Sequence, residues 1–481
     1  MRRQLTVFVV LGALLASGCG GAKGSDKADT SSSSDGTTAT TAGGSDSSAP
    51  DGGAGKFGSI ESPCGPGDAK VKADQAGAGA DKLYIGVAND RTSIRNGLLK
   101  ELFDGATGFA KWCNEQGGVA GLPVEVVDMD GKLFEIEAAM AKACTGVFAM
   151  VGGGYAQDNL IFTGKDGSDF HKCGMVAVPG FAVSTEFAEA SDQIQAIPNP
   201  PHLKGVSHFE GLKSVYPDKI AKYGVAFGDL PSIVQNKDQT VATVKAVEGY
   251  GDPVEISYDP INQDFAVTAQ QVIDKGLELV SYIGEPSGLS KFSQALKDQG
   301  WDGVITADAN QYDSRLLAAS GPAAVEGVTV RSNMHPFEEA DEWPATKQFM
   351  EIMDANVDGW EHAVLAIQAF SSTLLFATLA KQCSEDGEIT RECIMEKGLE
   401  VHDWDGGGLH SSGDPGANTP GSCSMIVHVE NGTWTRLYPE VGSDDDDGDG
   451  FHCGDVVEVT GNFGEGNQES SVLGTWPVKT S

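Results

Sequence analysis

The chain has 481 residues and a formal net charge of -36 at pH 7, because 69 acidic residues outnumber 33 basic ones. Affinity for a phosphate backbone comes from Lys and Arg contacts, so this charge argues against a nucleic acid partner. A solvated surface suited to salty surroundings is the simpler explanation of the acidity. Beyond the N-terminus the sequence has no run of eighteen consecutive apolar residues, and we therefore expect no membrane-spanning helix.

Residues 1–19 have the pattern of an export signal. Arg2 and Arg3 precede an apolar run that ends in Leu15-Ala16-Ser17-Gly18-Cys19. A charged start, a short apolar core and a small-residue cleavage site are typical of such signals, and the cysteine at the end resembles a bacterial lipobox. The resemblance implies that residues 1–18 are a lipoprotein signal peptide and that Cys19 is lipidated. An ordinary secretory signal followed by a chance cysteine is the alternative.

Residues 19–80 are predicted to be a low-complexity tether. Gly, Ser, Thr, Ala and Asp dominate up to about residue 56, and such a segment lacks the apolar content needed to fold. The protein would then lie on the extracytoplasmic face of the cell membrane, on the periplasmic side if the cell has an outer membrane, held by its acyl chain alone. The rest is too long for one core of ordinary size. We expect lobe one over 81–200, lobe two over 201–335, a return segment completing both lobes over 336–440, and an acidic, Gly-rich extension over 441–481.

Strands and helices alternate from Leu83 onwards. Short apolar runs without polar alternation predict buried strands, and amphipathic stretches between them predict helices. The expected strands of lobe one are 83–88, 122–127, 147–151 and 175–178, with helices over 94–115 and 133–145. After a Pro-rich crossing at 197–201, lobe two has expected strands over 223–227, 254–258, 279–283 and 304–307, with helices over 265–275 and 290–299. Such βαβ units imply an α/β fold of two doubly wound, Rossmann-like lobes joined by a hinge, with parallel sheets covered by helices.

This architecture predicts where a ligand binds. In open α/β sheets, ligands bind beyond the carboxyl ends of the strands, and two facing lobes would turn those ends into a cleft that closes around a solute.

Motifs of catalysis are missing from the sequence: it has no Gly-x-Ser-x-Gly elbow, no His-Glu-x-x-His and no P-loop. We therefore expect a binding protein and not an enzyme.

Eight cysteines remain once Cys19 is assigned to the lipid anchor. An even number in an exported protein favours disulfides, and the absence of any Cys-x-x-Cys disfavours a metal site. Many pairings are open to eight cysteines. Short loops favour Cys383–Cys393, Cys423–Cys453 and Cys144–Cys173, which leaves Cys64–Cys113.

A set of segments in fixed order resembles one family. The stretch Phe109-Ala-Lys-Trp-Cys-Asn-Glu-Gln-Gly-Gly-Val-Ala-Gly-Leu-Pro-Val-Glu-Val-Val127 resembles a helix, glycine turn and strand of type I periplasmic binding proteins, above all the branch that serves branched-chain amino-acid ABC importers. Further similar segments are 176–180, 221–226, 280–284 and 359–364. The likeness covers roughly 83–437. It implies a type I periplasmic-binding-protein fold that closes on a ligand and performs no chemistry.

The resemblance also implies a ligand site. In the family, the ligand carboxylate lies on the loops after strands three and four, and the amino group meets an acidic or aromatic side chain of the second lobe. The matching positions here are Tyr155, Ala156, Gln157, Asp158, Gly180, Phe181 and Ala182 in lobe one, and Asp229, Ser232, Glu285, Asp308, Asn310 and Tyr312 in lobe two. An acidic second wall favours a ligand with an amine or several hydroxyls.

Several of these assignments have a structural alternative. Asp158 would repel a ligand carboxylate unless a cation such as Arg91 or Arg95 offsets its negative charge. Asp158 is equally explained as the cap of a following helix. The two arginines are equally explained as solvated residues at the start of a helix. Phe181 and Tyr312 are equally explained by packing at the rim of the cleft.

Residues 444–455 read DDDDGDGFHCGD. Asp445, Asp447 and Asp449, followed by Gly450, have the alternation that begins a calcium loop, but Val456 stands where a bidentate Glu is expected. A structural calcium site therefore competes with a solvated acidic linker, and we expect no other cofactor.

Together these features predict a lipid-anchored substrate-binding protein that closes on a small polar solute, such as an amino acid or a related amine or amide, and delivers it to an ABC permease. A ligand-sensing receptor that feeds a signalling partner is the alternative, since both would use the same two lobes.

Overall fold

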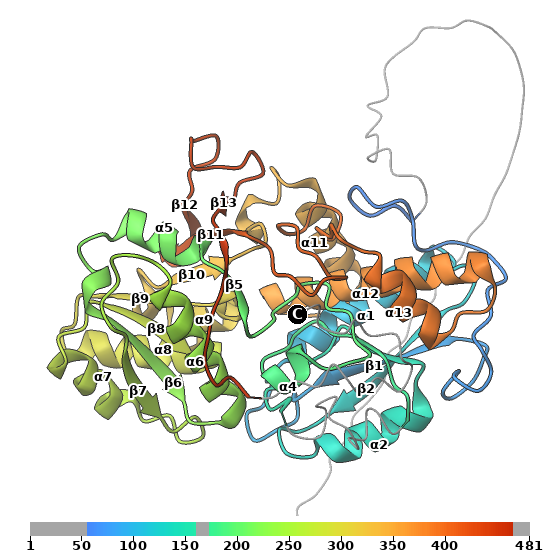
Figure 1. The fold of residues 1–481 in the computed structure, drawn as a ribbon, viewed down its shortest axis with the longest axis horizontal. Coiled ribbons are helices and arrows are strands. Elements are labelled where there is room, and N and C mark those ends of the chain that lie inside the picture. Colours follow the sequence, from blue (N-terminus) through green and yellow to red (C-terminus); the bar gives the residue numbers. More distant parts are fainter. Residues whose placement is uncertain (1–54, 160–172, 465–481) are drawn as a thin grey trace, which may run out of the picture. The chain divides into compact units, whose positions relative to one another are not determined.

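A computed structural model describes residues 55–159 and 173–464 (Figure 1). The first sheet contains four parallel strands in the order β2-β1-β3-β4. The strands are β1 (Leu83–Asn89), β2 (Val124–Asp130), β3 (Ala149–Val151) and β4 (Ala177–Val178). Around them lie α1 (Lys100–Glu115), α2 (Ile136–Gly146), α4 (Thr185–Ala188), α11 (Pro344–Asn356), α12 (Val364–Asp386) and α13 (Arg391–Leu399). Helices α1 and α12 pack on each other and on this sheet (Figure 1), so lobe one is built from segments that are far apart in the chain.

The glycine motif between α1 and β2 shows why this part of the sequence folds as it does. Gly118 has a φ of 79°, and a Cβ there would lie 2.3 Å from the carbonyl oxygen of Leu122, so only glycine fits. Asn114 bonds the backbone of Val124 twice, through Nδ2 to O at 2.9 Å and from N to Oδ1 at 2.7 Å. The motif thus fixes the end of α1 against the start of β2.

Helix α12 is the core helix of lobe one. By length and composition alone this helix could cross a membrane. However, 83% of its most apolar 18-residue stretch is buried inside the protein. The ring of Phe370 on this helix lies 5.2 Å from that of Phe109 and 5.2 Å from that of Phe349. Its apolar surface is therefore covered by neighbouring elements of the same chain.

The second sheet has the order β12-β11-β10-β9-β8-β6-β7, with β13 also paired to β11. Its strands are β6 (Tyr223–Gly228), β7 (Val254–Tyr258), β8 (Leu279–Ile283), β9 (Val304–Ala307), β10 (Thr329–Ser332), β11 (Cys423–Glu430), β12 (Thr433–Tyr438) and β13 (His452–Cys453). Helices α5 (Ser207–Val215), α6 (Pro231–Lys245), α7 (Phe265–Asp274), α8 (Pro286–Asp298), α9 (Ser314–Ala319) and α10 (Pro322–Val325) pack around it, together with short 3₁₀ turns at 220–222, 309–311 and 337–339.

This second sheet is mixed, and the prediction of wholly parallel sheets is wrong for its edge. Strands β6 to β10 pair in parallel, whereas β11 pairs antiparallel with both β10 and β12. The hairpin between β11 and β12 turns at Asn431 and Gly432, whose φ angles are 53° and 77°. Asn-Gly is the preferred pair for such a two-residue turn. The turn reverses the chain, so β12 runs antiparallel to β11, whereas a crossover helix would have kept the two strands parallel.

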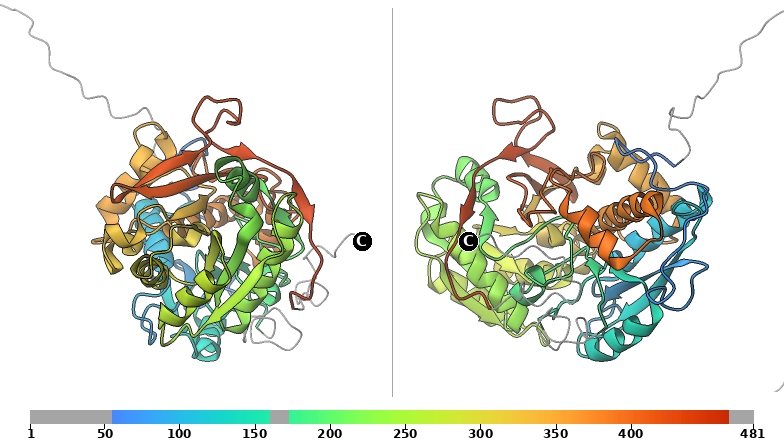
Figure 2. Two further views of the ribbon diagram at one scale, coloured as in Figure 1. Left: turned by 90° about the vertical axis from the view of Figure 1, so that its left-hand side faces the viewer. Right: turned by 45° about the vertical axis from the view of Figure 1, so that its right-hand side comes forward.

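The chain passes between the lobes three times: between α4 and α5, between β10 and α11, and between α13 and β11. The first crossing contains β5 (Leu203–Gly205), which pairs antiparallel with β14 (Val456–Glu458). Strand β14, drawn in red in Figure 2, therefore belongs to the folded body, as do the buried Val459 and Phe463 beyond it. Only part of the predicted extension over 441–481 lies within the described residues.

The predicted tether is too long at its C-terminal end. Phe57 is fully buried, with its ring 4.9 Å from that of Phe370, and Val71 forms a β-bridge with Ile389. Residues 55–80 are thus packed on lobe one, because a few apolar side chains and a disulfide at Cys64 fix this otherwise polar segment. Residues 1–54, with Cys19 and most of the predicted tether, lie outside the described residues.

The structure contains the four predicted disulfides: Cys64–Cys113, Cys144–Cys173, Cys383–Cys393 and Cys423–Cys453. The first joins the N-terminal segment to α1, and the third joins the end of α12 to α13. The fourth joins β11 to β13, so it holds the acidic loop between β12 and β13 against lobe two.

Candidate functional site

A cavity of about 380 Å³ lies where strand ends of both lobes meet. Its volume is within the range of small-molecule sites, and its wall is largely apolar. Lobe one contributes Leu98, Leu99, Leu133, Phe181 and Leu365, and lobe two contributes Leu230, Ile233, Ile261 and Ile283. A solute in this cavity would contact both lobes at once.

One polar cluster in the cavity wall joins the lobes, and we call it the cross-lobe clasp: Arg95, Gln263, Glu285 and Ser287. Arg95, in the loop after β1, donates through Nη2 to Oε1 of Gln263 at 2.7 Å and to Oγ of Ser287 at 3.3 Å. The same guanidinium forms an ion pair with Glu285, which also accepts from Nε2 of Gln263 at 2.6 Å. Because the cation belongs to lobe one and its partners to lobe two, the clasp stabilises the contact between them.

A second cross-lobe contact lies beside α1. Nη1 of Arg315, on α9, donates to the carbonyl oxygen of Gly97 at 2.7 Å, and Nη2 lies 2.7 Å from Oε2 of Glu101. Burial raises the pKa of Glu101, although Arg315 opposes that shift. Oγ of Ser232, at the start of α6, donates to the carbonyl oxygen of Ala156 at 2.6 Å and adds a third contact between the lobes.

Another polar cluster lines the cavity at the ends of β9 and β10, and we call it the β9–β10 cluster: Lys204, His208, Asp308 and Arg331. Nε of Arg331 donates to Oδ1 of Asp308 at 2.7 Å. Desolvation in the cavity would raise the pKa of Asp308, but its side chain is 56% exposed, and the interaction with Arg331 outweighs desolvation and lowers the pKa. Asp308 is therefore ionised at neutral pH.

The pKa values of the two bases of this cluster are lowered as well, which favours their neutral forms. Burial, with a smaller contribution from Arg331, lowers the pKa of His208 to about 3, so its imidazole is neutral at pH 7. Burial also lowers the pKa of Lys204 to about 7. Nζ of Lys204 donates to Oδ1 of Asn199 at 2.9 Å, and within 55–159 and 173–464 no carboxylate forms an ion pair with it.

A sequence model of the family described as periplasmic binding protein matches residues 217–460, which is 244 of 481 residues and so just over half of the chain. This chain belongs to the periplasmic binding protein family. That is a family of solute-binding proteins and not of enzymes. The matched range includes 441–460, which the predicted likeness left out.

Solved structures share the fold of this periplasmic binding protein at low sequence identity. The fatty acid ABC transporter substrate-binding protein from Thermomonospora curvata gives a TM-score of 0.64 at 16% identity and covers 78% of this chain and 95% of that one. The leucine binding protein LivK from Thermotoga maritima gives 0.61 at 17%, covering 74% and 97%. LivJ from Streptococcus pneumoniae, solved in complex with isoleucine, gives 0.59 at 17%, covering 74% and 100%. This confirms the two-lobed type I fold. Among curated protein sequences, none matches the chain significantly.

Half of the predicted ligand residues line the cavity: Ala156, Gly180, Phe181, Ala182, Glu285, Asp308 and Asn310. The predicted cation Arg91 does not. It pairs with Asp128, and its guanidinium lies 4.2 Å from the centre of the Phe103 ring, so Arg95 is the arginine of this loop that reaches the cavity.

Three predicted residues of the first loop are buried away from the cavity. Tyr155 donates through Oη to the carbonyl oxygen of Met129 at 2.8 Å, and Gln157 donates through Nε2 to that of Leu133 at 3.1 Å. Asp158 is fully buried and accepts from the backbone N–H of Val183 at 2.7 Å and of Ser184 at 2.9 Å. The alternative, in which Asp158 caps backbone N–H groups, is closer to this arrangement than a ligand contact is. The capped groups belong to a loop 25 residues further along the chain, however, and not to the next helix.

Carboxylates of the protein itself occupy three N–H groups of the two loops where a ligand carboxylate was expected. Asp158 occupies two amides of the loop after β4, and Oδ2 of Asp90 accepts from the N–H of Ala156 in the loop after β3 at 2.8 Å. Burial raises the pKa of both Asp90 and Asp158 to about 6, although their amide partners oppose the shift. Both carry negative charge at neutral pH, where a ligand carboxylate was expected.

Three predicted residues of lobe two lie outside the cavity wall. Asp229 is exposed, and Ser232 is buried in its cross-lobe bond to Ala156. Tyr312 is buried and donates to Glu338 while its Oη accepts from the N–H of Phe337 at 2.8 Å. Tyr312 thus packs in the core and not at the rim of the cleft, which was its structural alternative. Glu285 and Asp308 do line the cavity, but each is paired with an arginine.

The sequence prediction missed Lys204, His208 and Arg331. Arg331 lies on β10, and the β-branched run from Val328 to Val330 was a signal for that strand. Lys204 lies on β5, whose partner β14 is about 250 residues further along the chain, and no local pattern points to such a pairing.

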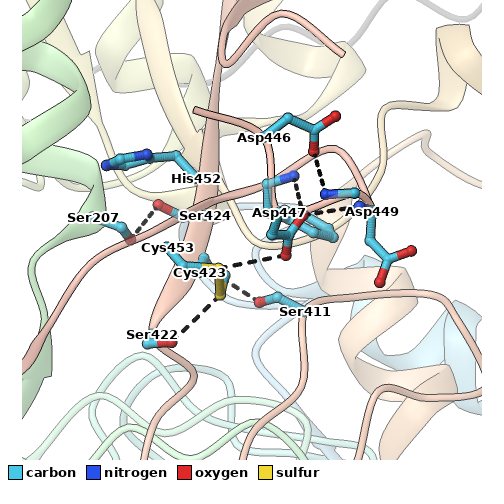
Figure 3. Close-up of a disulfide and its surroundings, with 12 residues drawn as sticks. Ser207, Ser411, Ser422, Cys423, Ser424, Asp446, Asp447, Asp449, His452 and Cys453 are labelled. Carbon is cyan, nitrogen blue, oxygen red and sulfur yellow. Dashed lines mark hydrogen bonds between the residues drawn. A yellow bond between two sulfur atoms is a disulfide. The ribbon is translucent and has the colours of Figure 1, made fainter. Parts of the chain in front are cut away.

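The acidic loop does not gather the predicted calcium ligands. Asp446 accepts from the N–H groups of Gly442, Gly448 and Gly450, and Oδ1 of Asp447 accepts from that of Asp449 at 2.9 Å. Figure 3 shows the carboxylate of Asp449 pointing away from that of Asp447. Among the described residues, the potential metal group nearest this loop is Cys423, Asp447 and Cys453. Its two cysteines form a disulfide and supply no thiolate.

Proposed function

We propose that this periplasmic binding protein is the exported, lipid-anchored solute-binding component of an ABC importer. The observation that carries the proposal is the cavity, whose wall both lobes supply and across which the cross-lobe clasp forms. A wall that is mostly apolar, with a few polar groups at defined places, is typical of a small-molecule site. Contact with both lobes would let the solute favour their closed arrangement, which a permease could recognise.

The solute is proposed to be a small polar molecule such as an amino acid or a related amine or amide. Solved structures of the same fold are named for fatty acid, leucine and isoleucine, and all three of those molecules carry a carboxylate. The acidic second wall is weaker support for an amine than the sequence indicated, because Arg95 pairs with Glu285 and Arg331 with Asp308.

A thermal-shift screen against amino acids, amides, polyamines, sugars and short carboxylic acids tests the binding function. A solute at about 100 times its dissociation constant adds about 2.7 kcal/mol to the free energy of unfolding, which raises the melting temperature measurably. No shift with any of these solutes would contradict the proposal.

Anchoring is proposed to depend on Cys19, which would carry the acyl chain. In cell fractionation, the wild-type protein should sediment with membranes and Cys19→Ala should appear in the soluble fraction. Membrane association of Cys19→Ala equal to that of wild type would contradict the lipid anchor.

A further inference from the structure

The C-terminal segment adds a further connection between the lobes. We call residues 453–464 the strap, and Figure 1 draws it in red from β13 past β5. It begins in lobe two, where the Cys423–Cys453 disulfide joins it to β11. The N–H of Gly454 extends this attachment, since it donates to the carbonyl oxygen of Ser422 at 3.0 Å. The start of the strap is therefore held covalently on lobe two.

The middle of the strap follows the first crossing between the lobes in the opposite direction. Strand β14 pairs antiparallel with β5 over three residue pairs. Beyond these pairs, the N–H of Val206 donates to the carbonyl oxygen of Asp455 at 3.0 Å, and the N–H of Val459 donates to that of His202 at 2.8 Å. Because β5 leads from lobe one to lobe two, the antiparallel strap returns from lobe two to lobe one.

The end of the strap contacts lobe one. The hydroxyl of Thr185, the first residue of α4, is fully buried and donates to the carbonyl oxygen of Phe463. The ring of Phe463 is 1% exposed and lies 5.1 Å from that of His202. Unlike the start of the strap, this end is held by noncovalent contacts, so it can leave lobe one without a break in the chain.

The end of the strap also covers a direct contact between the lobes. Gln235, on α6 of lobe two, accepts at Oε1 from the N–H of Thr185 at 3.0 Å and donates through Nε2 to Oε2 of Glu186 at 2.8 Å. Gly464 lies against the same groups, since a Cβ there would be 2.5 Å from Nε2 of Gln235 and 3.3 Å from Oε1 of Glu186. Separation of α4 from α6 would therefore disturb the end of the strap.

This contact lies directly beside the cavity. Val183, two residues before Thr185, and Asn236, the residue after Gln235, both line the cavity wall. The clasp joins the lobes through other elements, the loops after β1 and β8 and the start of α8. The strap and the clasp are thus two separate restraints on the opening of the same cavity.

We propose that the strap is a latch: the docking of Phe463 on α4 holds the lobes together, and the cavity opens only when the end of the strap leaves lobe one. The strap remains on lobe two through its disulfide while its end is free. Its return to α4 is then an intramolecular step, which a high effective concentration favours. This inference concerns the motion of the lobes and does not depend on which solute binds.

Small-angle X-ray scattering and hydrogen–deuterium exchange of the full chain, without solute, test the latch. Phe463→Ala removes the buried ring at the end of the strap. We expect a larger radius of gyration than that of wild type and about tenfold faster exchange over 182–190 and 456–464, because local opening becomes less costly.

Phe451→Ala is the matched control. It removes the same atoms from a side chain that is 2% exposed and lies before the strap, with its ring 4.7 Å from that of His335. This variant should keep the radius of gyration of wild type and its exchange over 182–190.

A second pair of variants keeps the packing of the strap intact. Thr185→Val removes the hydroxyl that donates to Phe463, and the loss of one buried hydrogen bond should make exchange over 456–464 several-fold faster. Thr185→Ser keeps the hydroxyl and should exchange as wild type does.

Two results would overturn the proposal. One is a folded Phe463→Ala with the radius of gyration of wild type, whether or not its strap exchanges faster, because the lobes would then stay closed without the latch. The other is equal exchange over 456–464 in Thr185→Val and Thr185→Ser. Since no solute is present in these measurements, either result leaves the solute-binding function to its own test.

Discussion

Asp158 shows how one buried carboxylate can change the chemistry of a loop. It is fully buried, and its pKa of about 6 is raised from 3.8 by burial, against the effect of its amide partners. The folded protein therefore binds a proton on Asp158 more tightly than the unfolded chain does. This contribution to stability is fully present below pH 3.8 and is lost as the pH rises through 6.

The variant Asp158→Asn, which does not titrate, isolates this contribution. Between pH 5 and pH 7, wild type should lose about 1 kcal/mol of unfolding free energy relative to Asp158→Asn, as measured by urea denaturation. Asp229→Asn, which changes an exposed carboxylate of lobe two, is the matched control. A difference between wild type and Asp158→Asn that is constant with pH would contradict the buried titration.

At the scale of elements, buried strands were the most predictable features. Strands β8 and β9 begin and end where the apolar runs predicted, because strands buried on both faces read as continuous apolar sequence. The edge strand β7 also has its predicted bounds, although its residues alternate between buried and exposed. The start of α1 was less predictable. It begins at Lys100 and not near Ile94, since Leu99 has a φ of 58° and interrupts the helix.

Elements whose partners are distant in sequence were missed for a physical reason. Strand β5 has three residues and is stabilised by β14, and the segment over 55–80 is stabilised by α1 and α12. Neither partner can be inferred from local propensity. The same limit hid Lys204 from the candidate site, whereas Glu285 and Asp308 were found because each directly follows a predictable strand.

The packing of the N-terminal segment can be tested at Phe57. Its ring is fully buried against lobe one, so Phe57→Ala should lower the free energy of unfolding by about 3–5 kcal/mol, as measured by chemical denaturation. Phe134→Ala removes the same atoms at a site that is 62% exposed and should have little effect. Equal stabilities of the two variants would show that residues 55–80 behave as a tether.

At the scale of the whole molecule, the clasp couples the lobes through one arginine. Arg95→Gln removes the ion pair to Glu285, and because both side chains are about one-fifth exposed, we expect a loss of about 1 kcal/mol from the closed arrangement. Small-angle X-ray scattering of the solute-free protein should give a larger radius of gyration for Arg95→Gln than for wild type. Arg91→Gln is the control, since Arg91 pairs within lobe one. Identical radii for all three proteins would contradict the role of the clasp.

The central claim is that one small solute binds inside the cavity between the lobes. Titration calorimetry with the solute that gives the largest thermal shift tests it most directly, in wild type and in Ala156→Trp, which places a large ring at a half-buried position of the cavity wall. We expect one solute per chain, a negative change in heat capacity from the burial of apolar surface, and no binding by a folded Ala156→Trp. Binding by Ala156→Trp as tight as that of wild type would contradict the claim.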